Sequence, residues 1–258
     1  MKLAVFAPFG LMSREAGVMY LLANYLHKNG AEVMQLRCDG AQRACARDAV
    51  TPGFRTPFAC APCMSEQSAL AQWAGVKSRS LSTLLGPEDV TQSRMWLAGL
   101  ASDELFRAEF RGESLWQCCQ EQFLSRWGLQ GGQEISAEQE ANLRDLFVAH
   151  IQVRVAAERF LSAVKPTLHF VAGGNEGASC AYLFEAKRAG GEVAVFGYDA
   201  ETDSISVRSS GAQTVYQTSL ILEGITSMRN EPRTWAPEVT AIVHEMLSFL
   251  GCAPDRVL

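Results

Sequence analysis

The sequence lacks the features that mark several large classes of protein. It has 23 Lys and Arg against 28 Asp and Glu, a net charge of −5, so a basic face for nucleic-acid phosphates is not expected. No run reaches the ~18 uninterrupted apolar residues of a membrane span. The apolar start at residues 2–7 is too short for an export signal. We therefore expect a cytoplasmic protein with no membrane span and no nucleic-acid partner.

Sequence motifs of familiar catalytic sites are also missing. There is no Walker sequence, no GxGxxG fingerprint, no HExxH pair and no Ser, His and Asp order that indicates a nucleophilic triad. The four histidines lie on expected helices or strands, with His150 on a long helix and His169 inside a strand. No catalytic residue is predicted, and whether the chain is an enzyme stays open.

What the sequence does contain is a strand–helix–strand unit in each half. Both units begin with a short apolar run, which is typical of a strand buried on both faces of a parallel sheet. The elements expected are strands at 2–7, 32–37, 168–172 and 192–196 and helices at 14–29 and 178–189. Crossovers of this kind are right-handed. The sequence thus predicts an α/β fold with an open, mostly parallel, Rossmann-like sheet flanked by helices, in one domain over 1–258.

Helical patterns dominate the region between these units. We expect a helical insertion at about 65–135, followed by a long buried helix at 137–164 that ends before Pro166. Ser136 and Gln139 stand at capping-box spacing at its start. The remaining expected elements are helices at 66–74, 87–100, 103–110 and 114–127, a short strand at 80–82, strands or loop at 204–216, and a closing helix at 237–250.

Half of the eight cysteines lie in one segment, 38–63, which is rich in Gly, Pro and Arg and is expected to be an irregular loop. Their order is C-x6-C-x14-C-x2-C, formed by Cys38, Cys45, Cys60 and Cys63. Four thiolates complete the site of a zinc ion or an iron–sulfur cluster, and spacing does not decide between the two. The sequence predicts a metal-clipped, Cys-rich loop with these four ligands.

Other interpretations of the cysteines remain open. The four thiols can be unrelated, and the Cys-Ala-Pro-Cys run at 60–63 before a helix is also typical of a redox dithiol, although no apolar strand precedes it. Cys118 and Cys119 are adjacent on a helix and are not expected to face one site, and Cys180 and Cys252 are expected to be core or incidental residues.

Several small or polar residues follow the expected strands, at the edge where open α/β sheets bind ligands. Backbone N–H groups of the glycine-rich turn at 173–177 are candidates for binding an anion. The ligand-binding candidates are Gly10, Ser13, Arg14, Asp39, Gly173, Gly174 and Asn175. Tight turns, helix starts and caps explain the same residues equally well.

The order of features resembles the N-terminal half of GT-B glycosyltransferase-like proteins of bacterial surface and capsular polysaccharide synthesis. The resemblance rests on the opening strand and helix and on segments 36–40, 60–63, 110–115 and 171–189. It implies a sugar ligand, a nucleotide-sugar substrate, and a C-terminal-type GT-B domain or partner protein. Two other functions stay open, namely a non-catalytic metal-binding module that docks on a partner enzyme, and an iron–sulfur redox protein.

Overall fold

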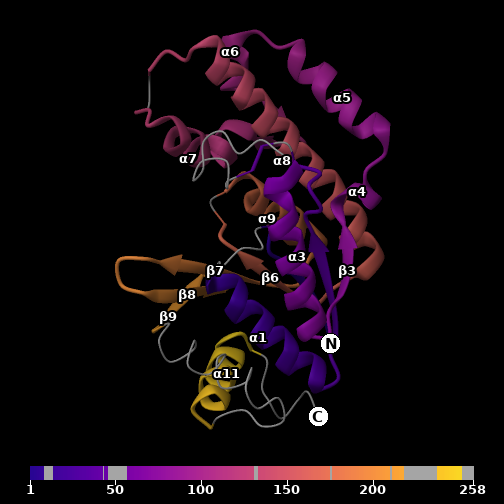
Figure 1. The fold of residues 1–258 in the computed structure, drawn as a ribbon, viewed down its shortest axis with the longest axis vertical. Coiled ribbons are helices and arrows are strands. Elements are labelled where there is room, and N and C mark those ends of the chain that lie inside the picture. The colour runs from indigo at the N-terminus through magenta and orange to yellow at the C-terminus, as the bar shows by residue number, and fades with distance from the viewer. Residues whose placement is uncertain are drawn as a thin grey trace.

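A computed structural model shows a mixed α/β fold with helices on both faces of one large sheet (Figure 1). The residues that the structure describes are 1–8, 14–42, 44–45, 57–130, 133–174, 176–209, 211–217 and 237–251.

The central sheet has seven strands in the order β3-β2-β1-β6-β7-β8-β9. The first five in this order pair in parallel, while β7, β8 and β9 form an antiparallel edge. The strands are β1 (Lys2–Phe6), β2 (Glu32–Arg37), β3 (Lys77–Ser80), β6 (Leu168–Ala172), β7 (Glu192–Asp199), β8 (Ser204–Ser209) and β9 (Ala212–Gln217). The predicted open, mostly parallel, Rossmann-like sheet is confirmed.

One face of the sheet is covered by α1 (Arg14–Lys28), α3 (Pro57–Trp73) and α11 (Pro237–Phe249). Figure 1 shows α1 and α11 together on this side of the strands. The apolar residues of α1 recur at helical spacing, so the helix buries one broad stripe against the sheet. Tyr25 of α1 also hydrogen-bonds His244 of α11, with 2.7 Å between the hydroxyl and Nε2.

The opposite face is covered by α8 (Ala137–Val164) and α9 (Gly177–Ala189). The capping box predicted for α8 is present: Ser136 accepts from the Gln139 N–H at 3.3 Å, and the Gln139 side chain accepts from the Ser136 N–H at 2.7 Å. The helix ends at Val164, two residues before Pro166, as the sequence predicts.

Helix α8 is longer than the sheet needs, and its N-terminal half extends into a separate helical layer (Figure 1). The apolar cluster that α8 forms there with the preceding helices contains Leu143, Leu146, Phe147, Val148, Ile151 and Val155. This layer contains α5 (Pro87–Ala98), α6 (Ser102–Leu105) and α7 (Leu115–Trp127), with a two-stranded ribbon of β4 (Glu109–Phe110) and β5 (Glu113–Ser114).

Some predicted elements of this region are wrong in detail. The segment from 38 to 63 is not loop throughout, because α3 begins at Pro57, nine residues before the predicted start. The expected strand at 80–82 ends at Ser80 and gives way to α4 (Leu81–Leu84), and the expected helix at 103–110 stops at Leu105. Within the described parts of the chain, no helix is long and apolar enough to cross a membrane.

Candidate functional site

The four predicted metal ligands lie on two elements and the segment between them. Cys38 directly follows β2, Cys45 lies in the described pair 44–45, and Cys60 and Cys63 are in the first two turns of α3. Residues three apart on a helix share a face. The Cys60–Cys63 segment, which was interpreted as part of a chelating loop, is therefore helical. It places its two thiols on one side of the helix.

The structure brings these segments close to one another. Burial raises the pKa of the Cys38 thiol to about 11, with smaller contributions from the charges of Cys45 and Cys63. Among the described residues, no three of the four sulfurs lie within 4.8 Å of one another. A Cβ added at Gly40 would lie 3.8 Å from the Cβ of Cys60. Whether the four thiols hold a metal stays a prediction.

Two of the ligand-binding candidates have protein partners. Arg14 forms an ion pair with Asp203 in the turn between β7 and β8, and its guanidinium carbon lies 4.9 Å from the centre of the Tyr198 ring. Asp39 accepts hydrogen bonds from the Ser82 hydroxyl and, at 3.2 Å, from the Ser82 N–H at the start of α4. These contacts tie α1 to the antiparallel edge and β2 to α4.

Gly173 and Gly174, in the glycine-rich turn after β6, have different roles. Gly173, with φ of +77°, donates its N–H to the Phe196 carbonyl at 2.7 Å and so joins the turn to β7. Gly174, with φ of +133°, lines a pocket. The other candidates, Gly10, Ser13 and Asn175, lie outside the described residues.

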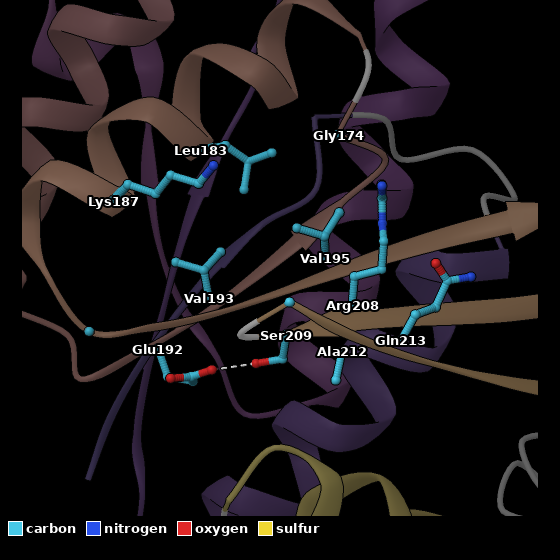
Figure 2. A pocket seen from close by; sticks show the side chains of 12 residues that line it. Gly174, Leu183, Lys187, Glu192, Val193, Val195, Arg208, Ser209, Ala212 and Gln213 are labelled. Carbon is cyan, nitrogen blue, oxygen red and sulfur yellow. Dashed lines mark hydrogen bonds between the residues drawn. The ribbon is translucent and has the colours of Figure 1, made fainter.

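This pocket has a volume of about 510 Å³ and lies beside α9 on the face of the antiparallel edge (Figure 2). Its floor is apolar, with Leu183 of α9 and Val193 and Val195 of β7. In the sheet register Val195 is opposite Arg208 of β8, which is opposite Gln213 of β9, so the three side chains share one face. The remaining lining residues are Gly174, Lys187, Gly191, Glu192, Ser209, Gly211 and Ala212.

The charged side chains that line this pocket come from both faces of the sheet edge. Figure 2 shows Arg208 reaching toward Gly174 and Lys187 of α9 lying beside Leu183, while Glu192 and Ser209 bond to each other on the other side of the strands. A Cβ at Gly174 would stand 3.0 Å from a Val195 methyl and 3.5 Å from Arg208 Nη2. Among the described residues, neither cation forms a salt bridge.

A second polar group is buried where α7, α8 and α9 meet. The Arg154 side chain is fully buried and pairs with two carboxylates, Glu113 of β5 and Glu185 of α9, the latter at 2.5 Å from Nε. Its guanidinium carbon lies 3.8 Å from the centre of the Phe184 ring. Glu185 also accepts from the half-exposed Arg188 at 3.0 Å.

Glu113 connects this ion-pair network to a histidine. His150 Nε2 lies 3.1 Å from Glu113 Oε2, and His150 Nδ1 lies 2.8 Å from the Gly177 carbonyl oxygen. Burial opposes ionisation of Glu113, but hydrogen bonds from His150 and Cys118 and the charge of Arg154 outweigh it and lower the pKa. Glu113 is therefore an anion at neutral pH.

Two thiols complete the group. Cys118 Sγ is 3.2 Å from Glu113 Oε1 and 2.8 Å from Cys180 Sγ, which is itself 3.9 Å from Glu113 Oε1. The hydrogen bond between the sulfurs raises the pKa of Cys118, with burial adding, and lowers the pKa of Cys180. Cys180 packs against the apolar cluster of the helical layer, as expected of a core residue, while Cys252 lies outside the described residues. Cys118 and Cys119 face different surroundings, as predicted.

Comparison with known proteins gives no relative in sequence: no family model matches the chain, and no curated protein matches it. Two solved structures are similar in part. One is a CDPS from Fluoribacter dumoffii, at 9% identity and TM-score 0.43, covering 83% of this chain and 90% of that one. The other is AlbC, a cyclodipeptide synthase from Streptomyces noursei, at 12% identity and TM-score 0.40, covering 70% and 86%. At these scores we transfer no function from either.

The predicted resemblance to GT-B glycosyltransferases is nevertheless wrong. The similar solved structures are cyclodipeptide synthases and not glycosyltransferases. This contradicts both the resemblance and the role in polysaccharide synthesis that was predicted from it. The physical reason is that the resemblance depended on strand–helix–strand order, which many α/β proteins share. The prediction of a GT-B-type partner domain depended on this resemblance and has no other support.

Proposed function

We propose that the chain binds a small phosphorylated molecule that carries hydroxyl groups, such as a sugar phosphate or a nucleoside monophosphate, in the pocket beside α9. The observation that carries the proposal is that two cations, Lys187 and Arg208, line one pocket with an apolar floor. Ligand pockets combine such a floor with a few polar groups that fix orientation, and their volumes are ~300–1,000 Å³.

The polar side chains on the floor's own face suit the parts of such a ligand. A guanidinium and an ammonium group suit the oxygens of a phosphate. The Gln213 amide, on the same face as Arg208, can hydrogen-bond a ligand hydroxyl. Gly174 is required here by its φ of +133° and by Val195, since a Cβ would stand only 3.0 Å from a Val195 methyl. A cytoplasmic location, where such metabolites occur, is part of this proposal.

Calorimetric titration with AMP, ribose 5-phosphate and adenosine tests this proposal. We expect the two phosphates to bind and adenosine, which lacks the phosphate, to bind at least about tenfold more weakly, because a charge-assisted hydrogen bond contributes about 1.5–3 kcal/mol. Lys187→Ala and Arg208→Ala should each weaken AMP binding by a similar factor. Lys77→Ala and Arg79→Ala, on the opposite edge strand β3, are matched controls and should leave binding unchanged.

Equal affinity for AMP and adenosine would show that phosphate is not recognised. Equal losses in the β3 controls would show that the cations act only through net charge. No heat with any of the three probes, in folded protein at millimolar ligand, would contradict the proposal as a whole.

We also propose that Cys38, Cys45, Cys60 and Cys63 hold a zinc ion or an iron–sulfur cluster. The approach of Gly40, just after β2, to Cys60 in the first turn of α3 supports this. Cys60→Ser and Cys63→Ser should each remove the bound metal and speed proteolysis between β2 and α3. Elemental analysis and a visible spectrum of anaerobically purified protein check the result. Unchanged metal content in both variants counts against the site.

A further inference from the structure

The buried group formed by Glu113, Cys118, His150 and Cys180 resembles no ordinary structural ion pair. Its members come from β5 and α7, which are adjacent in sequence, and from α8 and α9, which lie further along the chain. One ligand-type atom each from Glu113, Cys118 and His150 lies within 4.8 Å of the other two. Oxygen, sulfur and imidazole nitrogen are the three donor types that zinc takes in proteins.

The hydrogen bonds fix which atom of His150 is available. A carbonyl oxygen can only accept, so Nδ1, at 2.8 Å from the Gly177 carbonyl, carries a proton. The second nitrogen, Nε2, therefore faces the Glu113 carboxylate, another acceptor, at 3.1 Å. A proton or a cation must lie between them. Imidazole ligands of zinc are held in this way, by donation from the other ring nitrogen to a backbone carbonyl or a carboxylate.

Glu113 is held in the manner of a metal ligand as well. Arg154 bonds Oε2 and so fixes the carboxylate from behind, while Oε1 faces the two sulfurs. Both thiols would bind as thiolates. The ion, Arg154 and Arg188 would then carry four positive charges, balanced by Glu113, Glu185 and the two thiolates.

The ligand atoms are near the positions that a tetrahedral ion needs, and they would move on binding. Bond lengths to zinc place nitrogen and oxygen ligands about 3.3 Å apart, oxygen and sulfur about 3.5 Å apart, and two sulfurs about 3.8 Å apart. His150 Nε2 is 3.1 Å from Glu113 Oε2, whereas Cys118 Sγ is 3.2 Å from Oε1, so the carboxylate would turn to present one oxygen to the ion. Cys180, 3.9 Å from Oε1 and outside the group of three, would move toward the ion. The two sulfurs, now at 2.8 Å, would move apart by about 1 Å.

We infer that Glu113, Cys118, His150 and Cys180 form a zinc site, separate from the four-cysteine site near α3. Four protein ligands leave no open position, so the ion would be structural and would join the helical layer to α9. Binding releases the thiol protons to solvent and changes no oxidation state.

Zinc stoichiometry of the full chain tests the inference. Metal-free, reduced protein is titrated with zinc, and with cobalt, whose thiolate charge-transfer bands report sulfur ligands. We expect two ions in the wild type, one in Cys118→Ala and one in His150→Gln. Cys119→Ala is the matched control, because it is the next buried cysteine on α7 and its sulfur faces Gly177 instead of the cluster; it should retain both ions.

The outcomes separate this site from the four-cysteine site. If the latter fails to bind, the wild type holds one ion and Cys118→Ala none, and the inference stands. If Cys118→Ala and His150→Gln keep the same stoichiometry as the wild type, the inference is overturned. A variant that does not fold is replaced by Glu113→Gln, which retains the shape and hydrogen-bonding oxygen of the side chain.

Discussion

Replacing Arg154 by leucine is expected to lower the free energy of unfolding by about 3–5 kcal/mol. The side chain is fully buried, and its loss leaves Glu113 and Glu185 without their common cation in a poorly solvated interior. Leucine fills much of the same space, so the cost is one of charge and not of a cavity. Chemical denaturation followed by circular dichroism measures the change.

Glu158→Ala is the matched control for this variant. Glu158 lies on the same helix, one turn further on, and pairs with Arg111 at 2.5 Å, but both side chains are about 40% exposed. Solvent screens such a pair, and its loss should cost no more than about 1 kcal/mol. If Arg154→Leu costs as little as Glu158→Ala, the buried network does not stabilise the junction of α8 and α9.

Phe160→Ala is expected to cost a similar amount, about 3–5 kcal/mol, for a different reason. Phe160 is fully buried in the half of α8 that packs on the sheet, and its removal leaves a cavity that rigid neighbours cannot fill. Denaturant titration should show a lower midpoint with an unchanged slope.

The control for Phe160→Ala is Met95→Ala on α5, since Met95 is 70% exposed and its truncation uncovers no cavity. That variant should change the unfolding free energy by less than about 0.5 kcal/mol. Comparable losses in the two variants would mean that α8 is not packed on the sheet as described.

The parallel part of the fold follows from local sequence pattern. Short apolar runs, helix stripes and a capping box placed β2, α8 and β6 at their observed bounds. These signals succeed because each depends on residues within a few positions of one another. The start of α3 was missed, because Pro57 and Pro62 favour a loop in a sequence-only interpretation. Packing against α1 outweighs that local preference.

Neither polar site was predictable in the same way. Lys187 is near the end of α9 and Arg208 is in a strand, so only the register of the sheet brings them to one pocket. The buried network did leave one signal, since His150 and Arg154 are four residues apart on a largely apolar, buried stretch of α8. Polar residues at that spacing on a buried helix need partners. Which residues become those partners, here Glu113 and Cys118, depends on the packing of α7 and β5.

The most direct test of phosphate binding is an NMR titration of ¹⁵N-labelled protein with AMP. The backbone amides of Gly174, Gly191 and Gly211, which line the pocket, should shift progressively and saturate, while those of Gly30 and Gly112 stay in place. Shifts confined to other parts of the chain, or no shifts at saturating AMP, would contradict the account.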